Sequence, residues 1–513
     1  MTYTLSENAL SFAGDEGIQT LIRLPLPIIK GNKDYAKREA LLQRMDELLR
    51  VSGVEDSFLT SEVALVYADW GPSHAGKSLS DCRIASIHRH AKQSLRCTVA
   101  RILSNESHRD FSVHLAESAL LQWFCGIDLD GVIRVPSKSS LQRMEAEVGV
   151  ERIHELHALL LTRASSTEPH GRSSLGLEEP VELSVIWMDS TCAQLDIHFP
   201  VDWLLLRDAV RTLIKSIKTI RKHGLKERMP TPETFIAQMN AQAMAMSASS
   251  RRGQGPDKKK ARKKILRTMK RLVKKVRQHA QRYRTLLEES WDKTALTQPM
   301  AQRIIDRITN VLTQLPDALK QAHERIIGER PIANKSKILS LYQPHAHVYV
   351  RGKSGAHLEF GLQLLISESA EGFIIDSHLI DKITNDSQLL MPAITRLRET
   401  FGPTIATTIV TDRGFTSAAN NKALAKATIT NGTLPRNPDD LANALQDPTM
   451  RRLHRRRAQT EARIGIFKGQ FLGDHLPTKN YDSQKRFVAW AALAHNLWVL
   501  ARLKQVTALL ATG

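Results

Sequence analysis

The feature that most constrains the fold is a change of hydrophobic period that occurs twice along the chain. Residues 181–188 form an apolar, strand-like run that leads into Asp189. From about residue 200 the apolar residues recur at helical spacing, and between 345 and 380 three strand-like runs follow, separated by Gly turns. The pattern therefore predicts strands and helices in one fold, with a long helical segment after the first strand.

Two stretches of this helical segment have clear patterns. One begins at Lys258 and carries apolar residues at heptad spacing for about three repeats, and a partner stretch runs from Ile304 to Leu315. Because the two stretches are close in sequence, we favour a helical hairpin that packs on itself over an intermolecular coiled coil. Residues 246–257, rich in Ser, Gly and Arg, are expected to form a mobile loop.

Residues 56–163 are predicted to be helical, and the structure of residues 1–55 is left open. Residues 1–55 have little periodicity, whereas 56–163 carry helical stripes and Ser residues that can cap helices. Short helices joined by tight turns form either a helix-turn-helix-like DNA-binding domain or a small helical bundle, and the sequence leaves both open. Residues 164–180 have the composition of a linker.

Charge points to a polyanionic partner. The 513-residue chain has a formal net charge of +20 and a pI of about 9.8, and 42% of its residues are apolar, enough for more than one core. Such an excess of positive charge attracts nucleic acid first. No stretch approaches the roughly 20 apolar residues of a spanning helix, no secretory signal is recognisable, and the four Cys are scattered. We expect a cytoplasmic protein.

Three carboxylates are placed where chemistry is expected. Asp189 and Asp412 each close an apolar strand-like run, and Glu461 is the single acid among seven Arg and Lys residues between Arg451 and Lys468. One such Asp alone is better explained as a turn or helix cap. Two of them, together with an acid in a basic helix, fit metal-assisted cleavage of a phosphodiester, with all three as ligands.

The basic helix around Glu461 adds groups that can bind phosphate. Arg457 lies four residues before Glu461 and Lys468 lies seven after it, so the three side chains share one helix face. Carboxylate oxygens are the ligands that Mg²⁺ prefers. We therefore predict two Mg²⁺ ions, for which Mn²⁺ can substitute, beside a phosphate-binding helix.

These residues resemble the DDE transposases of bacterial insertion sequences, in the group with the signature Y-x2-R-x3-E-x6-K. Here the signature reads His454-x2-Arg457-x3-Glu461-x6-Lys468, with His in the place of Tyr. Other matching stretches are Met188-Asp189-Ser190-Thr191, residues 197–202, Asn385-Asp386, Asp412-Arg413-Gly414-Phe415 and Leu434-Pro435-Arg436. Together they cover roughly residues 180–505.

The resemblance implies an α/β fold with a ribonuclease-H-like core, in which a mixed sheet has helices on both faces. Asp189 would lie on the first strand, Asp412 on the fourth and Glu461 on a following helix. The catalytic domain would comprise residues 181–200 and 336–513, and residues 201–335 would be a helical, basic insertion after the first strand.

A second basic region lies inside the insertion. From Arg251 to Arg277 there are fourteen Lys or Arg residues and one acid, Asp257. A solvated helix face is the usual explanation of a charge run, but like charges four residues apart destabilise a helix unless they are neutralised. We favour contact with DNA phosphates. The predicted DNA-binding residues are Arg457, Lys468, Arg413, Arg456, Lys260, Lys264, Arg267, Arg271 and Lys274.

The sequence thus predicts a transposase that binds the terminal inverted repeats of an insertion sequence, cleaves double-stranded DNA and joins the ends to target DNA. We expect a homodimer on DNA, associated with the bacterial nucleoid and without a membrane segment. The alternatives are a nuclease on the same fold, or a catalytically inactive DNA-binding regulator derived from a transposase.

Overall fold

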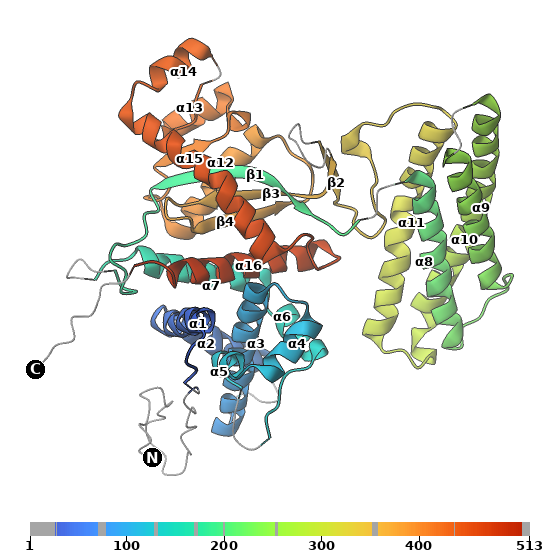
Figure 1. The fold of residues 1–513 in the computed structure, drawn as a ribbon. Coiled ribbons are helices and arrows are strands. Elements are labelled where there is room, and N and C mark those ends of the chain that lie inside the picture. Colours follow the sequence, from blue (N-terminus) through green and yellow to red (C-terminus); the bar gives the residue numbers. More distant parts are fainter. Residues whose placement is uncertain are drawn as a thin grey trace, which may run out of the picture.

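The computed structural model describes residues 26, 28–69, 78–127, 132–168, 173–197, 201–251, 255–350, 358–435 and 437–504. These residues form an N-terminal group of helices, a mixed sheet with its own helices, and a separate bundle of four long helices (Figure 1). No helix in these ranges is long and apolar enough to cross a membrane.

The N-terminal group contains seven helices. They are α1 (Lys33–Val51), α2 (Val54–Asp69), α3 (Asp81–Ser104), α4 (His108–Glu117), α5 (Ala119–Cys125), α6 (Lys138–Glu147) and α7 (Val150–Ser165). Ser side chains cap several of them: Ser107, Ser118 and Ser137 each accept a backbone N–H in the first turn of the helix that follows. Helices α2 to α7 occupy most of the described residues in the stretch 56–163, for which the sequence predicts helices, whereas α1 lies in residues 1–55, for which it predicts no structure.

The sheet has six strands in the described residues. They are β1 (Val185–Gln194), β2 (His347–Val350), β3 (Leu358–Glu368), β4 (Ile374–Ile380), β5 (Thr408–Thr411) and β6 (Thr430–Asn431). β1 lies in the centre, antiparallel to β3 and parallel to β5; β2 and β4 pair with β3, and β6 pairs with β5. The sheet is mixed, as predicted.

Helices lie on both faces of this sheet. After β4 the chain forms α12 (Asp386–Phe401), α13 (Ala418–Lys426), α14 (Pro438–Ala444), α15 (Pro448–Ile466) and α16 (Tyr481–Leu500). A π-helical segment, Phe467–Leu472, continues α15. α16 is buried along almost its whole length, because it separates the sheet from the N-terminal helices (Figure 1).

One hydrophobic core joins the N-terminal helices to the sheet through α16. Asn496 of α16 connects three elements: its side chain accepts from the backbone N–H of Ile374 at 2.9 Å, donates to the Ile374 carbonyl at 2.7 Å, and contacts His157 Nε2 of α7 at 2.7 Å. Burial lowers the pKa of His157 to about 3. The imidazole is therefore neutral at neutral pH and can accept the Asn496 N–H.

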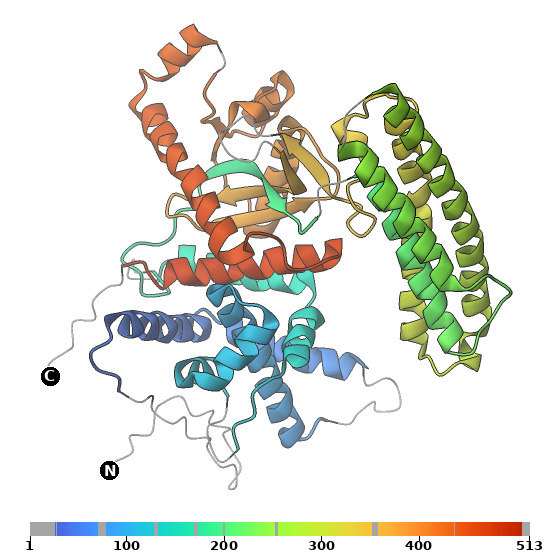
Figure 2. The ribbon, with the colours of Figure 1, turned by 45° about the vertical axis from the view of Figure 1, so that its right-hand side comes forward.

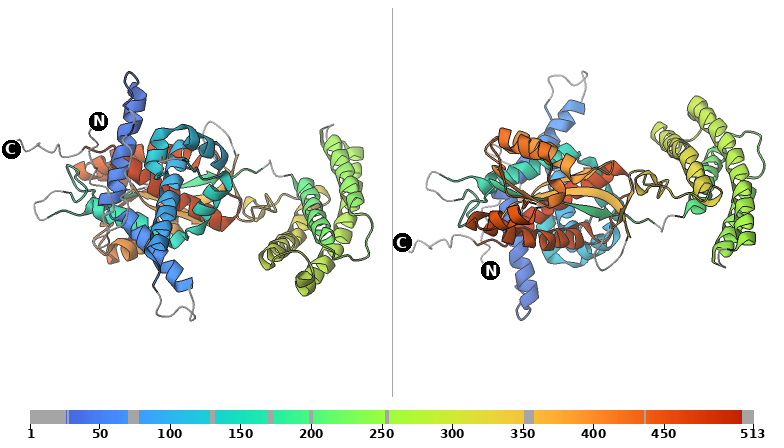
Figure 3. Two further views of the ribbon diagram at one scale, coloured as in Figure 1. Left: turned by 90° about the horizontal axis from the view of Figure 1, so that it is seen from below. Right: turned by 90° about the horizontal axis from the view of Figure 1, so that it is seen from above.

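The segment between β1 and β2 forms the bundle. Its helices are α8 (Asp202–Lys222), α9 (Pro232–Arg251), α10 (Pro256–Ser290) and α11 (Gln298–Ile326). The bundle has a hydrophobic core of its own, and Figures 2 and 3 show it standing beside the sheet rather than over it. The sequence predicts a hairpin between the stretch that begins at Lys258 and the stretch from Ile304 to Leu315. These stretches belong to α10 and α11, which pack against each other.

Three expectations about local structure are wrong. Asp189 does not close its strand, because β1 continues to Gln194 in register with β3. Asp412 follows the fifth strand rather than the fourth, since short β2 precedes β3. Residues 246–251 belong to α9 rather than to a loop. Pro256 and Asp257 of that expected loop begin α10. Its residues 252–254, together with residues 1–25, 198–200 and Arg436, lie outside the described residues.

The N-terminal helices are held together by a buried ion cluster. Arg96 of α3 is completely buried; it donates to Asp46 Oδ1 of α1 at 2.6 Å and to Glu55 Oε2 of α2 at 2.8 Å. Its guanidinium also lies over the Phe124 ring. Buried charges need such pairing, because removing one partner leaves the others uncompensated.

We expect Arg96→Ala to destabilise the protein by about 3 kcal/mol, the low end for a broken buried pair, because Lys92 stays 3.3 Å from Glu55. Thermal unfolding followed by circular dichroism measures this as a lower Tm. Arg83→Ala, at an exposed position of the same helix, is the control. Equal Tm values for the two variants would contradict the role of the cluster.

Candidate active site

Strand pairing brings two of the predicted carboxylates side by side. β1 and β5 are parallel, and Met188 is the register partner of Thr411. Asp189 and Asp412 each follow directly after these two partners. They therefore occupy neighbouring positions where the pairing of β1 with β5 ends. Strands of a parallel pair lie about 5 Å apart, which is the reason why two Asp residues distant in sequence become neighbours.

Helix α15 and its π-helical extension cross the sheet face on which Asp189 lies. Side chains alternate along a strand, so Trp187, Asp189 and Thr191 share one face of β1. The Trp187 indole donates to the carbonyl of Leu453 at 3.2 Å, and Lys468 donates to the Thr191 hydroxyl at 3.3 Å. These two contacts fix the helix at both ends, and Asp189 lies between them.

The predicted phosphate-binding and ligand residues lie on one flank of this helix. Leu453, Thr460 and Ile464 are buried toward the sheet, and at about 100° per residue Arg457, Glu461 and Lys468 follow one side of that buried ridge. Arg457 Nη2 lies 3.4 Å from Asp412 Oδ1. Glu461 is exposed, one turn beyond Arg457 on the same flank.

Arg456 lies on the opposite flank, and the structure gives it an internal position. Its guanidinium lies 3.1 Å from Glu368 Oε1, donates to the carbonyls of Ser369 and Ala370, and packs over the Trp187 ring at 4.9 Å. Only 12% of its side chain is exposed. Consecutive residues on a helix point about 100° apart, which explains why Arg456 and Arg457 diverge. Arg456 is therefore held inside the protein and does not face DNA.

The carboxylates repel one another electrostatically. Burial, together with the smaller effect of the nearby negative charges of Asp412 and Asp386, raises the pKa of Asp189 to about 6, although the Ser190 backbone N–H and Arg457 lower it. The Ser190 N–H donates to Asp189 Oδ1 at 2.8 Å. Carboxylates in this situation favour a bound cation, because a cation removes both the repulsion and the cost of burial.

Asp386 is a neighbour of this pair to which the sequence assigned no role beyond the resemblance at Asn385-Asp386. It accepts from the Ser190 hydroxyl at 2.7 Å and from Gln363 Nε2 at 3.2 Å. Since Ser190 and Asp189 point to opposite faces of β1, Asp386 approaches from the other face of the sheet. The resemblance at Asn385-Asp386 is the sequence signal that marks it.

Basic side chains surround Asp412. More than half of the Asp412 side chain is exposed, and its Oδ1 accepts the backbone N–H of Arg413 at 2.7 Å. His454, the residue in the place of the signature Tyr, lies close enough to be influenced by Arg413 and Arg457. Partial burial lowers the pKa of His454, and the positive charges of Arg457 and Arg413 lower it further.

The three carboxylates are not gathered into one ligand set. In the part of the chain that the structure describes, no three His, Cys, Asp or Glu side chains are grouped closely enough to hold a metal ion. Asp189 and Asp412 are brought together, and Glu461 lies on the flank of α15 that faces them without joining them.

The five predicted DNA-binding residues of the bundle lie along one face of α10. Lys260, Lys264, Arg267, Arg271 and Lys274 are all exposed, and their spacing of four, three, four and three residues places them in a single row. We call this row the α10 stripe. Among the described residues none of the five forms an ion pair, whereas Lys259 and Lys263 of the same helix both contact Glu329.

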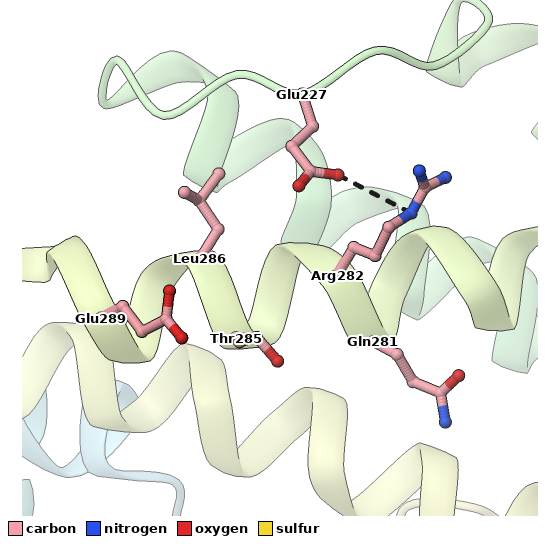
Figure 4. Close-up of a pocket in the computed structure, with 6 residues that line it drawn as sticks. All are labelled: Glu227, Gln281, Arg282, Thr285, Leu286 and Glu289. Carbon is pink, nitrogen blue, oxygen red and sulfur yellow. Dashed lines mark ion pairs between the residues drawn. The ribbon is translucent and has the colours of Figure 1, made fainter.

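A surface groove on the bundle does not belong to this site. Figure 4 shows its lining residues, five from α10 and Glu227 from the loop between α8 and α9. Arg282 Nε lies 3.7 Å from Glu227 Oε2 across it. The groove is remote from the carboxylates on the sheet, and we assign it no role in their chemistry.

Comparison with known proteins finds one family model that matches part of the chain. Residues 333–497 match the family model described as Transposase DDE domain. The match contains Asp412, Glu461, Arg457 and Lys468, but it begins after the bundle and so leaves out β1 with Asp189. No curated protein and no solved structure matches the chain. The match supports a transposase function in general and a transposase or nuclease class of enzyme; that family uses divalent metal and acts on DNA.

The raised pKa of Asp189 predicts a pH-dependent stability. A carboxyl group whose pKa is higher in the folded state destabilises that state above the folded pKa, near 6 here, and has no effect below its unfolded pKa. Without divalent cations, Asp189→Asn should therefore raise the Tm at about pH 8 by the equivalent of about 1–3 kcal/mol, and the gain should vanish near pH 4. Thermal unfolding in a chelator measures both.

The exposed Asp196→Asn, two residues beyond the end of β1, is the matched control and should leave the Tm unchanged at either pH. A wild-type protein that is more stable than Asp189→Asn at about pH 8 would show that Asp189 is not held at an electrostatic cost.

Proposed function

We propose that this chain is the transposase of a bacterial insertion sequence, which cleaves DNA at the element's ends and joins those ends to target DNA by metal-assisted phosphoryl transfer. The observation that carries the proposal is the pair Asp189 and Asp412, set on neighbouring parallel strands beneath a helix that carries Arg457, Glu461 and Lys468 on one flank. The family match over residues 333–497 supports it independently.

The chemistry of these donors fits a hard divalent cation. All three proposed ligands, Asp189, Asp412 and Glu461, offer carboxylate oxygens, which suit Mg²⁺ and Mn²⁺. The raised pKa of Asp189 agrees with a site built for positive charge. When bound, two such ions would supply Lewis-acid activation of a water or a 3′-hydroxyl and stabilisation of the leaving oxygen. Glu461 is proposed as the third ligand from its place on the flank of α15.

The protein's own basic residues would hold the DNA. Arg457 and Lys468 lie on either side of Glu461, each about one to two turns away, so both would contact phosphates of DNA bound at the carboxylates. Arg413 is exposed next to Asp412 and would add a third phosphate contact. We propose no covalent protein–DNA intermediate, since water and then the released 3′-hydroxyl act as the nucleophiles.

The arrangement of the sheet supports a ribonuclease-H-like core as a further part of the proposal. The first acid lies on the central strand β1, the second follows the strand parallel to it, and helices cover both faces. The bundle of residues 202–326 then separates the first strand from the rest of the catalytic domain, and residues 33–165 form the N-terminal helical domain. A homodimer on DNA and a nucleoid-associated location in the cytoplasm belong to the same proposal.

A nuclease on the same fold is the second candidate, because the family match supports either class of enzyme. The two differ in strand transfer. A transposase joins a pre-cut transposon end to target DNA, whereas a nuclease hydrolyses DNA without joining it. Incubation of a labelled pre-cut end with circular target DNA and Mg²⁺ separates them by the appearance of joined product.

Asp412→Asn should abolish end cleavage and leave DNA binding intact. The amide keeps the oxygen that accepts the Arg413 N–H, so the turn is preserved while a metal ligand is lost. Cleavage of a labelled end in Mg²⁺ and band-shift binding are the two measurements. Asp440→Asn, at an exposed position of α14, should cleave normally. Cleavage by Asp412→Asn in Mg²⁺ would falsify the ligand assignment.

Neutralising the α10 stripe should weaken DNA binding through loss of phosphate contacts. With all five residues changed to Gln, the slope of log affinity against log salt should become shallower by up to about 4.5, since each phosphate contact contributes about 0.9. Fluorescence anisotropy with a duplex of unrelated sequence measures the slope. The paired variant Lys259→Gln, Lys263→Gln, whose two side chains share an ion pair with Glu329, should change it little.

An unchanged slope in the five-residue variant would mean that the stripe is only a solvated face. If that variant still cleaved DNA, the assignment of the carboxylates would be unaffected, because the stripe and the carboxylates are tested by separate variants.

A further inference from the structure

The bundle carries a second row of basic residues that the sequence did not single out. Arg211, Lys215, Lys218 and Lys222 of α8 are all exposed, at spacings of four, three and four residues. We call this row the α8 stripe. The residues of α8 that point the other way, such as Leu213 and Ile217, are completely buried in the bundle core. The stripe therefore faces directly away from that core.

The charge of the bundle is concentrated on two of its four helices. α8 contains six Lys or Arg residues and two acidic residues, and α10 contains fourteen Lys or Arg residues and three acidic residues. α9 contains one basic and one acidic residue, and α11 contains four basic and three acidic residues. The positive surface is thus divided between α8 and α10, with almost neutral helices between them.

Packing places the two basic helices across the bundle from each other. α8 and α10 each pack against both α9 and α11 and also contact one another through the core, whereas α9 and α11 share no comparable contact. Going around the bundle, the order is therefore α8, α9, α10, α11. Since each stripe is opposite the buried side of its own helix, the α8 and α10 stripes point to opposite sides of the bundle.

Both stripes have unbalanced charge. Neighbouring like charges at i, i+3 and i, i+4 repel one another and destabilise a helix. Within the described residues, only Lys218 among the nine members forms an ion pair, with Glu233 at 2.6 Å, and both side chains are about half exposed. Neither row contains an acid. A polyanion on each side would neutralise this repulsion.

Distance allows two polyanions to bind together. Helices in a bundle lie about 8–10 Å apart and are about 10–12 Å wide, so opposite faces are separated by roughly 20 Å. The Debye length at physiological salt is about 8 Å. Two duplexes held on opposite faces would therefore be largely screened from each other, whereas one duplex cannot contact both rows at once.

We propose that the bundle binds two DNA duplexes simultaneously, one on the α10 stripe and one on the α8 stripe, and so bridges DNA segments next to the catalytic domain. The inference rests on the proposed function in that it takes the partner to be DNA. The contacts are to phosphates, so bridging does not depend on base sequence. The α10 stripe is the longer, about 21 Å from Lys260 to Lys274 at about 1.5 Å per residue.

A bead assay with the full chain tests the bridge. Protein is loaded on a bead-tethered duplex of unrelated sequence, unbound protein is washed away, and a second, fluorescent duplex of unrelated sequence is added at low salt. Wild-type protein should capture the fluorescent duplex. The α8 variant Arg211→Gln, Lys215→Gln, Lys222→Gln should capture at least fivefold less of it per bound protein, while its affinity for a single duplex falls no more than about twofold.

The matched control is Arg303→Gln, Arg307→Gln, Lys320→Gln, which removes the same charge from exposed positions of near-neutral α11. It should capture the second duplex as the wild type does. Circular dichroism should show the same helical signal for both variants, since all six positions are exposed.

The outcomes separate the two proposals. Wild-type protein that binds no duplex at all contradicts the proposed function. Wild-type protein that binds the tethered duplex but captures no second one overturns the two-face inference alone. Full capture by the α8 variant, as a dimer bridging through its α10 stripes would give, also overturns it. An equal loss of capture in the α11 control also overturns the inference, because bridging would then depend on net charge alone.

Discussion

The parallel pairing of β1 with β5 is the contact on which the rest of this structure depends. It places Asp189 beside Asp412, although 222 residues separate them in the sequence, and it makes β1 the centre of the sheet. With β3 on its other side, β1 has no free edge. Its two faces are therefore both defined: one receives α15, and the other packs into the core shared with α16. A shift of β1 by one residue would turn Asp189 away from α15.

The chain has two large, separate hydrophobic cores. α16 is buried between the sheet and the N-terminal helices, so these parts share one core and hold one another in place. The bundle has its own core and leaves the sheet after β1, and the family match begins beyond it, at residue 333. A rigid carboxylate site thus stands next to an appended helical unit whose charge is carried on its outside. Under the proposed function, DNA binding by the bundle and phosphoryl transfer at the carboxylates would be altered by separate substitutions.

The sequence predicted elements better than contacts. The heptad spacing identified α10 and its α11 partner, because buried positions on a long helix repeat regularly. It also placed Asp412 directly after a strand and Glu461 on a helix. It missed the continuation of β1 past Asp189, because Ser190-Thr191-Cys192 has no apolar signal of its own and becomes a strand through pairing with β3. It also grouped Arg456 with Arg457, whose environments differ because they lie on opposite sides of a buried ridge.

By itself, the sequence determined which side chains are present at which spacing: an acid after each of two apolar runs, a third in a basic helix, and rows of Lys and Arg at helical intervals. Those are local properties, set by the period of the backbone. Only the tertiary structure decided which of them meet. Strand register joined Asp189 to Asp412, helix packing turned Arg456 inward to Glu368, and the order of helices around the bundle set the α8 and α10 stripes on opposite sides. Such choices depend on contacts between distant segments, and no local pattern specifies them.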